Sequence, residues 1–176
     1  MGVGPPRRLA GSLSRVRCQA PTRTPSSAEA LRKRVERGAR PPGINAVVDL
    51  YNAVSIAYAL PVGGEDIDAY AGSPRLTIAK GDEPFQTDQG RRTGDRASGS
   101  GEVVWLDDLG VTCRRWNWRQ GPRTRITLDT RSMWFVLERL EPMPVTRLHE
   151  AGEMLKGSLR RLAPGIEIEI QLIDTA

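Results

Sequence analysis

The sequence is poor in the residues that most often carry covalent or metal chemistry. It holds one histidine and two cysteines, and it has no G-x-S-x-G elbow, no Walker loop and no GxGxxG after a predicted strand. Cys18 and Cys113 are far apart and form no CxxC pattern, so both are expected to be free thiols. His149 falls in an amphipathic helical pattern and is interpreted as a solvated surface residue. A Ser-His or Cys-His mechanism is therefore not expected, and no metal or cofactor is predicted.

Long apolar runs are also missing. No run approaches the roughly 20 residues that a membrane-spanning helix needs. Residues 1–11 lack the apolar stretch of a secretory signal, so we expect a cytoplasmic protein with no membrane partner. The composition, with 39% hydrophobic and 27% charged residues, is typical of a globular protein. A chain of this length is sufficient for one domain with a core of its own.

The charge balance favours an acidic partner. The formal net charge is +5 at pH 7, and most of the positive side chains are arginines. The planar guanidinium group binds phosphate and stacks on bases, which indicates a nucleic acid as partner. A high-GC genome with an arginine bias would give the same composition, so charge alone leaves this choice open.

The pattern predicts a weakly structured segment over residues 1–25 and a single domain over residues 26–176. The boundary is marked by Ser26 and Glu29, which form an S-x-x-E capping box at the start of a helix that stops at Gly38. Further helices are predicted from Asn45 to Pro61 and from Thr146 to Leu162, where apolar residues recur at helical spacing.

The middle of the chain is predicted to be mainly antiparallel sheet, which gives an α+β fold class. Asp107 to Gly110 is interpreted as the four-residue connection of a hairpin, and Gln86 to Gly101 as a mobile surface loop. The predicted strands are RLTIA (Arg75–Ala79), EVVWL (Glu102–Leu106), VTC (Val111–Cys113), TRITL (Thr124–Leu128), MWFVLERL (Met133–Leu140) and IEIEIQLI (Ile166–Ile173).

An unusual segment, CRRWNWRQ, covers Cys113 to Gln120 and follows a predicted strand directly. Indole rings offer stacking surfaces and guanidinium groups bind phosphate, so this mixture suits a nucleotide or a single-stranded tRNA end. A pair of core tryptophans with arginines stacked on them would produce the same sequence, and this alternative stays open.

Two further places hold candidate polar groups. Asp49 and Asn52 interrupt a largely apolar helix, and Gly63 and Gly64 would let the backbone come close to a ligand; helix capping and buried hydrogen bonding would explain the same polar residues. Glu138 stands among Val136, Leu137 and Leu140, where it either faces solvent or points into a pocket and reads a ligand's hydroxyl or ammonium group.

Several of these segments, in this order, resemble the B3/B4 domain family, whose best-known member edits Tyr-tRNA in the beta subunit of bacterial phenylalanyl-tRNA synthetase. The resemblance covers Ser26 to Leu162 and is closest to the free-standing branch. It implies mainly antiparallel sheets in a sandwich-like core flanked by helices, and hydrolysis of wrongly charged aminoacyl-tRNA. The segments that carry it are INAVVDLYNAVS, LPVGGEDIDAYAG, GDEPF, GEVVWLDDLGVTCRRWNWRQ, TRITLDT and FVLERL.

The resemblance also implies roles for individual residues. Asn52 matches the asparagine of the synthetase editing pocket, and Glu138 matches the late glutamate that reads the hydroxyl of the non-cognate side chain. Gly63 stands where the synthetase has a histidine, and Arg114 to Trp118 replace a glycine-rich stretch, so the pocket is expected to be remodelled for another amino acid. The expected catalytic residues are Asn52, Asn117 and Glu138, and the expected substrate-binding residues are Tyr51, Gly63, Gly64, Glu65, Arg114, Arg115, Trp116, Trp118 and Arg119.

The partner implied by the resemblance is the aminoacylated 3′ end of a tRNA, with no DNA. Deacylation of an ester that is already activated needs no strong base, which agrees with the lack of a catalytic triad. Two other functions fit the same residues: a tRNA-binding module that does not cleave the ester, and a domain that binds a free amino acid.

Overall fold

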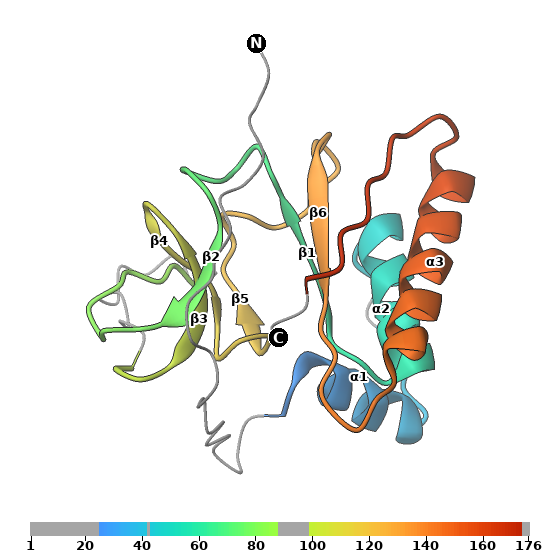
Figure 1. Cartoon of the computed structure of the whole chain (residues 1–176), viewed down its shortest axis with the longest axis horizontal. Coiled ribbons are helices and arrows are strands. Elements are labelled where there is room, and N and C mark those ends of the chain that lie inside the picture. Colours follow the sequence, from blue (N-terminus) through green and yellow to red (C-terminus); the bar gives the residue numbers. More distant parts are fainter. Residues whose placement is uncertain (1–24, 42, 88–98, 174–176) are drawn as a thin grey trace.

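The computed structural model describes residues 25–41, 43–87 and 99–173, which form three helices and two antiparallel sheets. In Figure 1 the two-stranded sheet of β1 and β6 lies between the helices on one side and the four-stranded sheet, in the order β2-β3-β4-β5, on the other. This confirms the predicted α+β class with antiparallel sheets. The elements are α1 (Ser27–Glu36), α2 (Ala46–Tyr58), β1 (Val62–Asp66), β2 (Arg75–Ile78), β3 (Val103–Asp107), β4 (Gly110–Arg114), β5 (Arg119–Gln120), β6 (Met133–Leu137) and α3 (Val145–Leu162).

The helix starts follow the capping signals in the sequence. The Ser26 hydroxyl accepts the backbone N–H of Glu29 at 3.2 Å, which is one half of the predicted capping box. The Asn45 side chain accepts the N–H of Val48 at 2.9 Å and so begins α2. All three predicted helices are confirmed to within three residues at each end.

The main core packs α2 and α3 against β1 and β6. Phe135 and Leu137 of β6 contact it from the sheet side. Full burial of a side chain of this size stabilises the fold by roughly 1.5–3 kcal/mol. The enclosed members are Val54, Leu60, Val62, Ala151, Leu155 and Leu159, and other apolar residues at helical spacing on α2 and α3 pack against them while only partly buried.

The pairing of β1 with β6 decides which side chains face the four-stranded sheet. Gly64 lies opposite Phe135 on the helix side, and Glu65 lies opposite Trp134 on the other side, because successive side chains in a strand alternate between faces. The Trp134 ring then meets the Trp105 ring of β3 at a centroid distance of 5.2 Å. The LPVGGED segment is therefore a strand that joins the two layers.

The β3–β4 hairpin is confirmed, but its connection is two residues long and not four. Asp107 pairs with Gly110, so only Asp108 and Leu109 lie between the strands. The Asp107 carboxylate accepts the N–H groups of Leu109 at 3.0 Å and Gly110 at 3.2 Å, and these bonds hold the turn tight.

Two predicted strands are wrong. Thr124 to Leu128 forms a single bridge, between Arg125 and Glu65, because threonine hydroxyls there bond to nearby backbone N–H groups: Thr130 accepts from Thr127 at 3.0 Å. Residues Ile166 to Ile173 are assigned no strand despite their strict alternation; Ile168 packs on the main core, and the segment pairs with no other described strand.

Some predictions concern residues outside the described ranges. Most of the predicted lead-in over residues 1–25 lies there, with Cys18, and so do residues 88–98 of the predicted loop from Gln86 to Gly101. These remain predictions.

Substitution of the two glycines of β1 should have different effects. At Gly64 an added Cβ would lie 2.9 Å from the Cδ1 atom of Ile126 and from ring carbons of Phe135, so Gly64→Ala is expected to destabilise the fold by about 1–3 kcal/mol. Gly63→Ala is the matched control, because a Cβ there meets nothing within 4 Å. Urea denaturation of both variants measures the difference. Equal midpoints would contradict the close packing of β1 on the helix side.

Candidate functional site

Glu138 is the residue at which the two layers meet through polar side chains. It follows the last residue of β6, and its N–H donates to the carbonyl oxygen of Pro61 at 3.1 Å. Its carboxyl group accepts a hydrogen bond from the Asn117 side-chain amide at 2.7 Å and another from the indole N–H of Trp116. Three of the residues singled out in the sequence therefore form one cluster, which we call the Glu138 cluster: Trp116, Asn117 and Glu138.

The turn that presents Trp116 and Asn117 joins β4 to β5 over residues 115–118. Arg115 and Trp116 have positive φ values of 47° and 64°, a conformation that costs a residue with a side chain roughly 1–2 kcal/mol. The turn is held by the N–H of Trp116, which donates to Val103 O at 2.7 Å, and by the N–H of Trp118, which donates to Arg114 O at 3.2 Å. The hydrogen bonds from Trp116 and Asn117 to Glu138 also support this turn, and so help to maintain its two positive φ values.

Burial raises the pKa of Glu138, because removal from water disfavours the charged carboxylate; hydrogen bonds from Asn117, Trp116 and Trp105 oppose the shift without cancelling it. A carboxyl group with a raised pKa holds its proton to higher pH than an exposed one. It therefore keeps a hydrogen-bond donor over a wider range of pH than an exposed glutamate does.

Glu65 forms a second polar centre between the layers, and it is 7% exposed. Its carboxyl group accepts from Thr124 Oγ1 at 2.7 Å and Gln120 Nε2 at 3.1 Å, and also from the hydroxyl of Tyr70. A longer bond of 3.5 Å comes from Thr112. These donors occupy the acceptor positions of Glu65, so its observed role is to connect the sheets, whereas the sequence predicted a substrate contact.

Tyr51 and Cys113 lie within the electrostatic reach of these carboxyl groups. Burial raises the pKa of Tyr51 to about 12, with a further contribution from Glu65. Burial also raises the pKa of the Cys113 thiol, and both Glu65 and Glu138 add to that shift. Cys113 is a free thiol, as predicted, and it stays protonated, so it is not an activated nucleophile.

Asn52 lies on the buried side of α2 and is 8% exposed. Its side-chain amide makes no hydrogen bond with any residue in the described ranges, so it joins neither Glu138 nor Asn117. Buried polar groups are normally paired with protein, water or a ligand. The amide of Asn52 is thus available, but the described contacts do not connect it with the Glu138 cluster as the sequence reasoning expected.

The three arginines of the segment have different surroundings. Arg114 donates two hydrogen bonds to Glu102, of 2.9 and 2.7 Å, and its side chain is only 14% exposed. Burial opposes ionisation of Glu102, but the Arg114 guanidinium lowers the pKa of that carboxyl below its ordinary value. Arg114 therefore has a structural partner, and its substrate contact stays a prediction, whereas Arg115 and Arg119 are more exposed.

The two predicted ligand-approach glycines also differ. Gly63 is exposed, and the space beside its Cα is open. Gly64 is buried against Ile126 and Phe135, so its lack of a side chain serves internal packing. Of the pair, only Gly63 leaves room for the backbone to meet a ligand.

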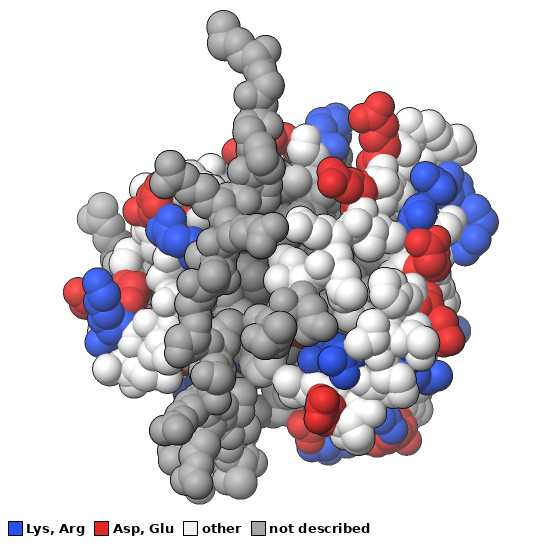
Figure 2. Space-filling model, viewed as in Figure 1, with Lys and Arg blue, Asp and Glu red and all other residues white. Residues whose placement is uncertain are grey.

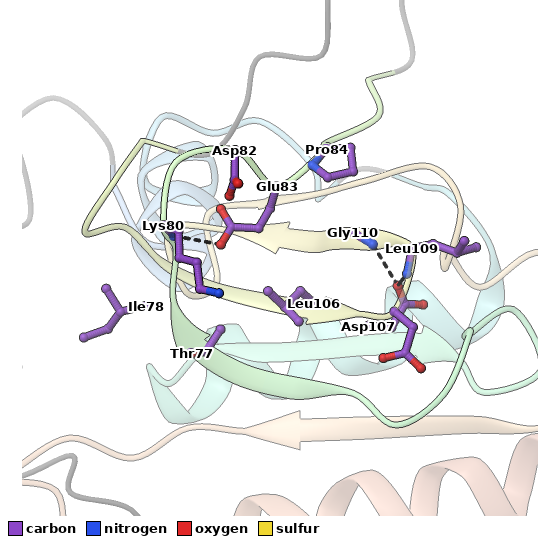
Figure 3. A pocket seen from close by; sticks show the side chains of 11 residues that line it. Thr77, Ile78, Lys80, Asp82, Glu83, Pro84, Leu106, Asp107, Leu109 and Gly110 are labelled. Carbon is purple, nitrogen blue, oxygen red and sulfur yellow. Dashed lines mark hydrogen bonds between the residues drawn. The ribbon is translucent and has the colours of Figure 1, made fainter.

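A hollow lies elsewhere, beside the β3–β4 hairpin (Figure 3). It has a volume of about 450 Å³ and includes none of the predicted site residues. Two of its acidic side chains have protein partners that are close in the fold: Asp107 is bound by Arg123 through two bonds of 2.7 Å, and Glu83 accepts the N–H of Lys80. Sequence reasoning missed the Asp107–Arg123 pair, whose partners are sixteen positions apart.

Charge is not gathered into one patch on the face seen in Figure 2, where Lys and Arg side chains alternate with Asp and Glu. Among the described residues, no group of three or more His, Cys, Asp or Glu side chains could hold a metal ion. His149 is exposed on α3, as predicted. No helix within the described ranges has the length and apolar character needed to cross a bilayer. The face seen in Figure 2 therefore shows no single basic patch, and the local chemistry of the β4–β5 turn is what favours a nucleic-acid partner.

Glu138→Gln should remove one component of the pH dependence of stability. The pKa of Glu138 is higher in the folded chain than in the unfolded chain, so this contribution is present below about pH 4.5 and is lost as the pH rises through the folded pKa. The lowered pKa values of Glu102 and Asp107 act at lower pH and with the opposite sign.

The measurement is urea unfolding of both proteins between about pH 4 and pH 8. As the pH rises, the difference in unfolding free energy should move in favour of the variant. Glu167→Gln, which changes an exposed carboxylate, controls for net charge. A difference that does not vary with pH would contradict the buried, proton-retaining state of Glu138.

Comparison with protein-family profiles matches the B3/4 domain over residues 13–173, a longer span than the Ser26 to Leu162 of the sequence resemblance. The comparisons with curated proteins and with solved structures found no match. The matched range includes every predicted site residue and all the helices and strands described above. The chain belongs to the B3/4 domain family, and this membership indicates a tRNA-related role.

Proposed function

We propose that this B3/4 domain is an aminoacyl-tRNA deacylase that acts in trans, hydrolysing the ester of a mischarged tRNA. The observation that carries the proposal is the Glu138 cluster: a buried carboxyl group from the end of β6 meets Trp116 and Asn117 from the β4–β5 turn. Membership of the B3/4 domain family supports tRNA as the molecule that carries the ester.

The reaction requires positioning more than strong acid–base chemistry. Water adds to the ester carbonyl carbon, an oxyanion forms, and the bond to the ribose oxygen then breaks. The water supplies the hydroxyl group that stays on the amino acid and the proton that the ribose oxygen takes up. Because the ester is already activated, orientation of the water and stabilisation of the oxyanion can be sufficient. A protonated thiol such as Cys113 takes no part.

The residues of the site have complementary roles in this proposal. Glu138, which retains its proton more strongly than an exposed glutamate, reads a polar group on the amino acid. The Asn117 amide donates to Glu138 through its nitrogen, and its oxygen, which has no partner in the described ranges, orients the water. Asn52, whose amide is unpaired within the described ranges, and the exposed backbone at Gly63 are proposed as further contacts of the substrate outside the Glu138 cluster.

The test uses the full chain and a panel of tRNAs, each charged with a cognate or a non-cognate amino acid. At least one mischarged ester should be cleaved well above its rate in buffer. Glu138→Ala and Asn117→Ala should each lower that rate by about 10²-fold or more, the scale of losing one transition-state contact. Arg160→Ala, which removes an exposed charge from α3, should cleave normally.

Thermal melting of each variant separates loss of activity from loss of fold. If no ester in the panel is cleaved faster than in buffer, the enzymatic proposal is wrong. If cleavage occurs but both cluster variants retain it in full, the site has been misassigned.

A second candidate function is a tRNA-binding module that leaves the ester intact. The observation that favours it is that both oxygens of Glu138 already accept bonds from protein donors. A complex with aminoacyl-tRNA that weakens steeply with added salt, and from which the tRNA is recovered still charged, would support this function over hydrolysis.

A further inference from the structure

The two tryptophans of the β4–β5 turn are used differently. Trp116 donates its indole N–H to Glu138 and so belongs to the interior contact between the layers. Trp118 is half-buried, and its ring is covered by the guanidinium of Arg115, whose central carbon is 4.7 Å from the ring centroid. The indole N–H of Trp118 has no acceptor among the residues that the structure describes. Trp118 is therefore the tryptophan of this turn that remains available to a ligand.

The guanidinium group of Arg115 has hydrogen-bond donors that no described residue uses. Its ion pair with Glu102 is long, at 3.9 Å, and its guanidinium donates no hydrogen bond to a described residue. The charge of Glu102 is already matched by the two short bonds from Arg114, so this carboxylate repels an approaching anion less than a free one would. Arg119 follows one residue after Trp118 and is exposed.

We propose that Arg115 and Trp118 form a preassembled platform on which the unpaired 3′-terminal base of a tRNA stacks, with Arg119 beside it for a backbone phosphate. This inference rests on the proposed tRNA function and specifies which residues of the site meet the RNA. The Glu138 cluster then meets the amino acid, and the platform meets the nucleotide that carries it.

The chemistry of the platform favours a single-stranded RNA end. An unstacked base offers a flat π-face of the kind that indole rings and guanidinium planes bind, and the adjacent phosphate takes the hydrogen bonds that Arg115 and Arg119 have available. The guanidinium is already stacked on Trp118, so little side-chain freedom is lost when a base arrives.

The experiment measures binding of a 5′-labelled ACCA tetranucleotide by fluorescence anisotropy, with the intact protein and no ester present. Trp118→Ala should weaken binding about tenfold or more, and Trp118→Phe, which keeps an aromatic face, should retain most of the affinity. Arg115→Asn removes the guanidinium while tolerating the positive φ, and should lower the salt slope by about 0.7. Arg160→Ala on α3 is the matched arginine control.

A second RNA that lacks only its terminal base identifies the contact. The wild type should bind it more weakly than ACCA, whereas Trp118→Ala should no longer distinguish the two. Wild-type protein that fails to bind ACCA, or a Trp118→Ala variant that melts normally and binds as tightly as wild type, would overturn the platform. Equal discrimination by both proteins would overturn it as well.

These outcomes are separate from those of the deacylation assay. If no ester is cleaved but the Trp118 variants lose RNA affinity as described, the platform stands and the enzymatic proposal falls. If esters are cleaved and Trp118→Ala leaves KM unchanged, the platform falls and the enzymatic proposal stands.

Discussion

The architecture depends on one buried carboxyl group. Glu65 extends from the two-stranded sheet and accepts hydrogen bonds from Thr112 in β4, Gln120 in β5 and Thr124 in the following connection. A two-stranded sheet is marginal by itself, and this one is supported by helices on one side and by Glu65 and the Trp134–Trp105 contact on the other. The position of Glu138 opposite the β4–β5 turn follows from this connection, because Glu138 lies just beyond the strand that pairs with β1.

The segment from Cys113 to Gln120, which the sequence analysis treated as one unit, contains side chains with two different roles. Arg114 and Trp116 point to protein partners, Glu102 and Glu138, and these contacts hold the turn. Arg115 and Trp118 contact each other and leave hydrogen-bonding groups unused. The alternative of structural indole and guanidinium groups therefore holds for Arg114 and Trp116, whereas ligand binding by Arg115 and Trp118 stays a prediction.

Local signals in the sequence were sufficient for much of the fold, and non-local ones were not. The Ser26 cap and the hairpin around Asp107 depend on neighbouring residues and were predicted. The strand containing Gly63 and Gly64 was missed because glycine disfavours strands, and its stability comes from β6, more than seventy positions away. The threonines near Thr127 resembled a strand because β-branched residues favour one, but their hydroxyls bond to the local backbone instead.

The same distinction applies to the site. Asn117 and Glu138 were both expected among the catalytic residues, and the structure brings them into contact at 2.7 Å. No pattern in the residues alone could have shown that Arg114 forms an ion pair with Glu102, since the pair is made across the β3–β4 hairpin. Whether Asn52 contacts Glu138 also depends on how α2 sits against the sheets, which periodicity does not specify.

Under the two proposals, the strained turn between β4 and β5 would contact both the amino acid and the nucleotide. Its two left-handed residues, Arg115 and Trp116, are adjacent; the Arg115 guanidinium covers the Trp118 ring, whereas the Trp116 indole donates to Glu138. A substitution that reshapes the inner surface for a different amino acid will also shift the outer one, because no flexible residue separates them. Selectivity for the amino acid and affinity for the tRNA end would then have to change together during evolution.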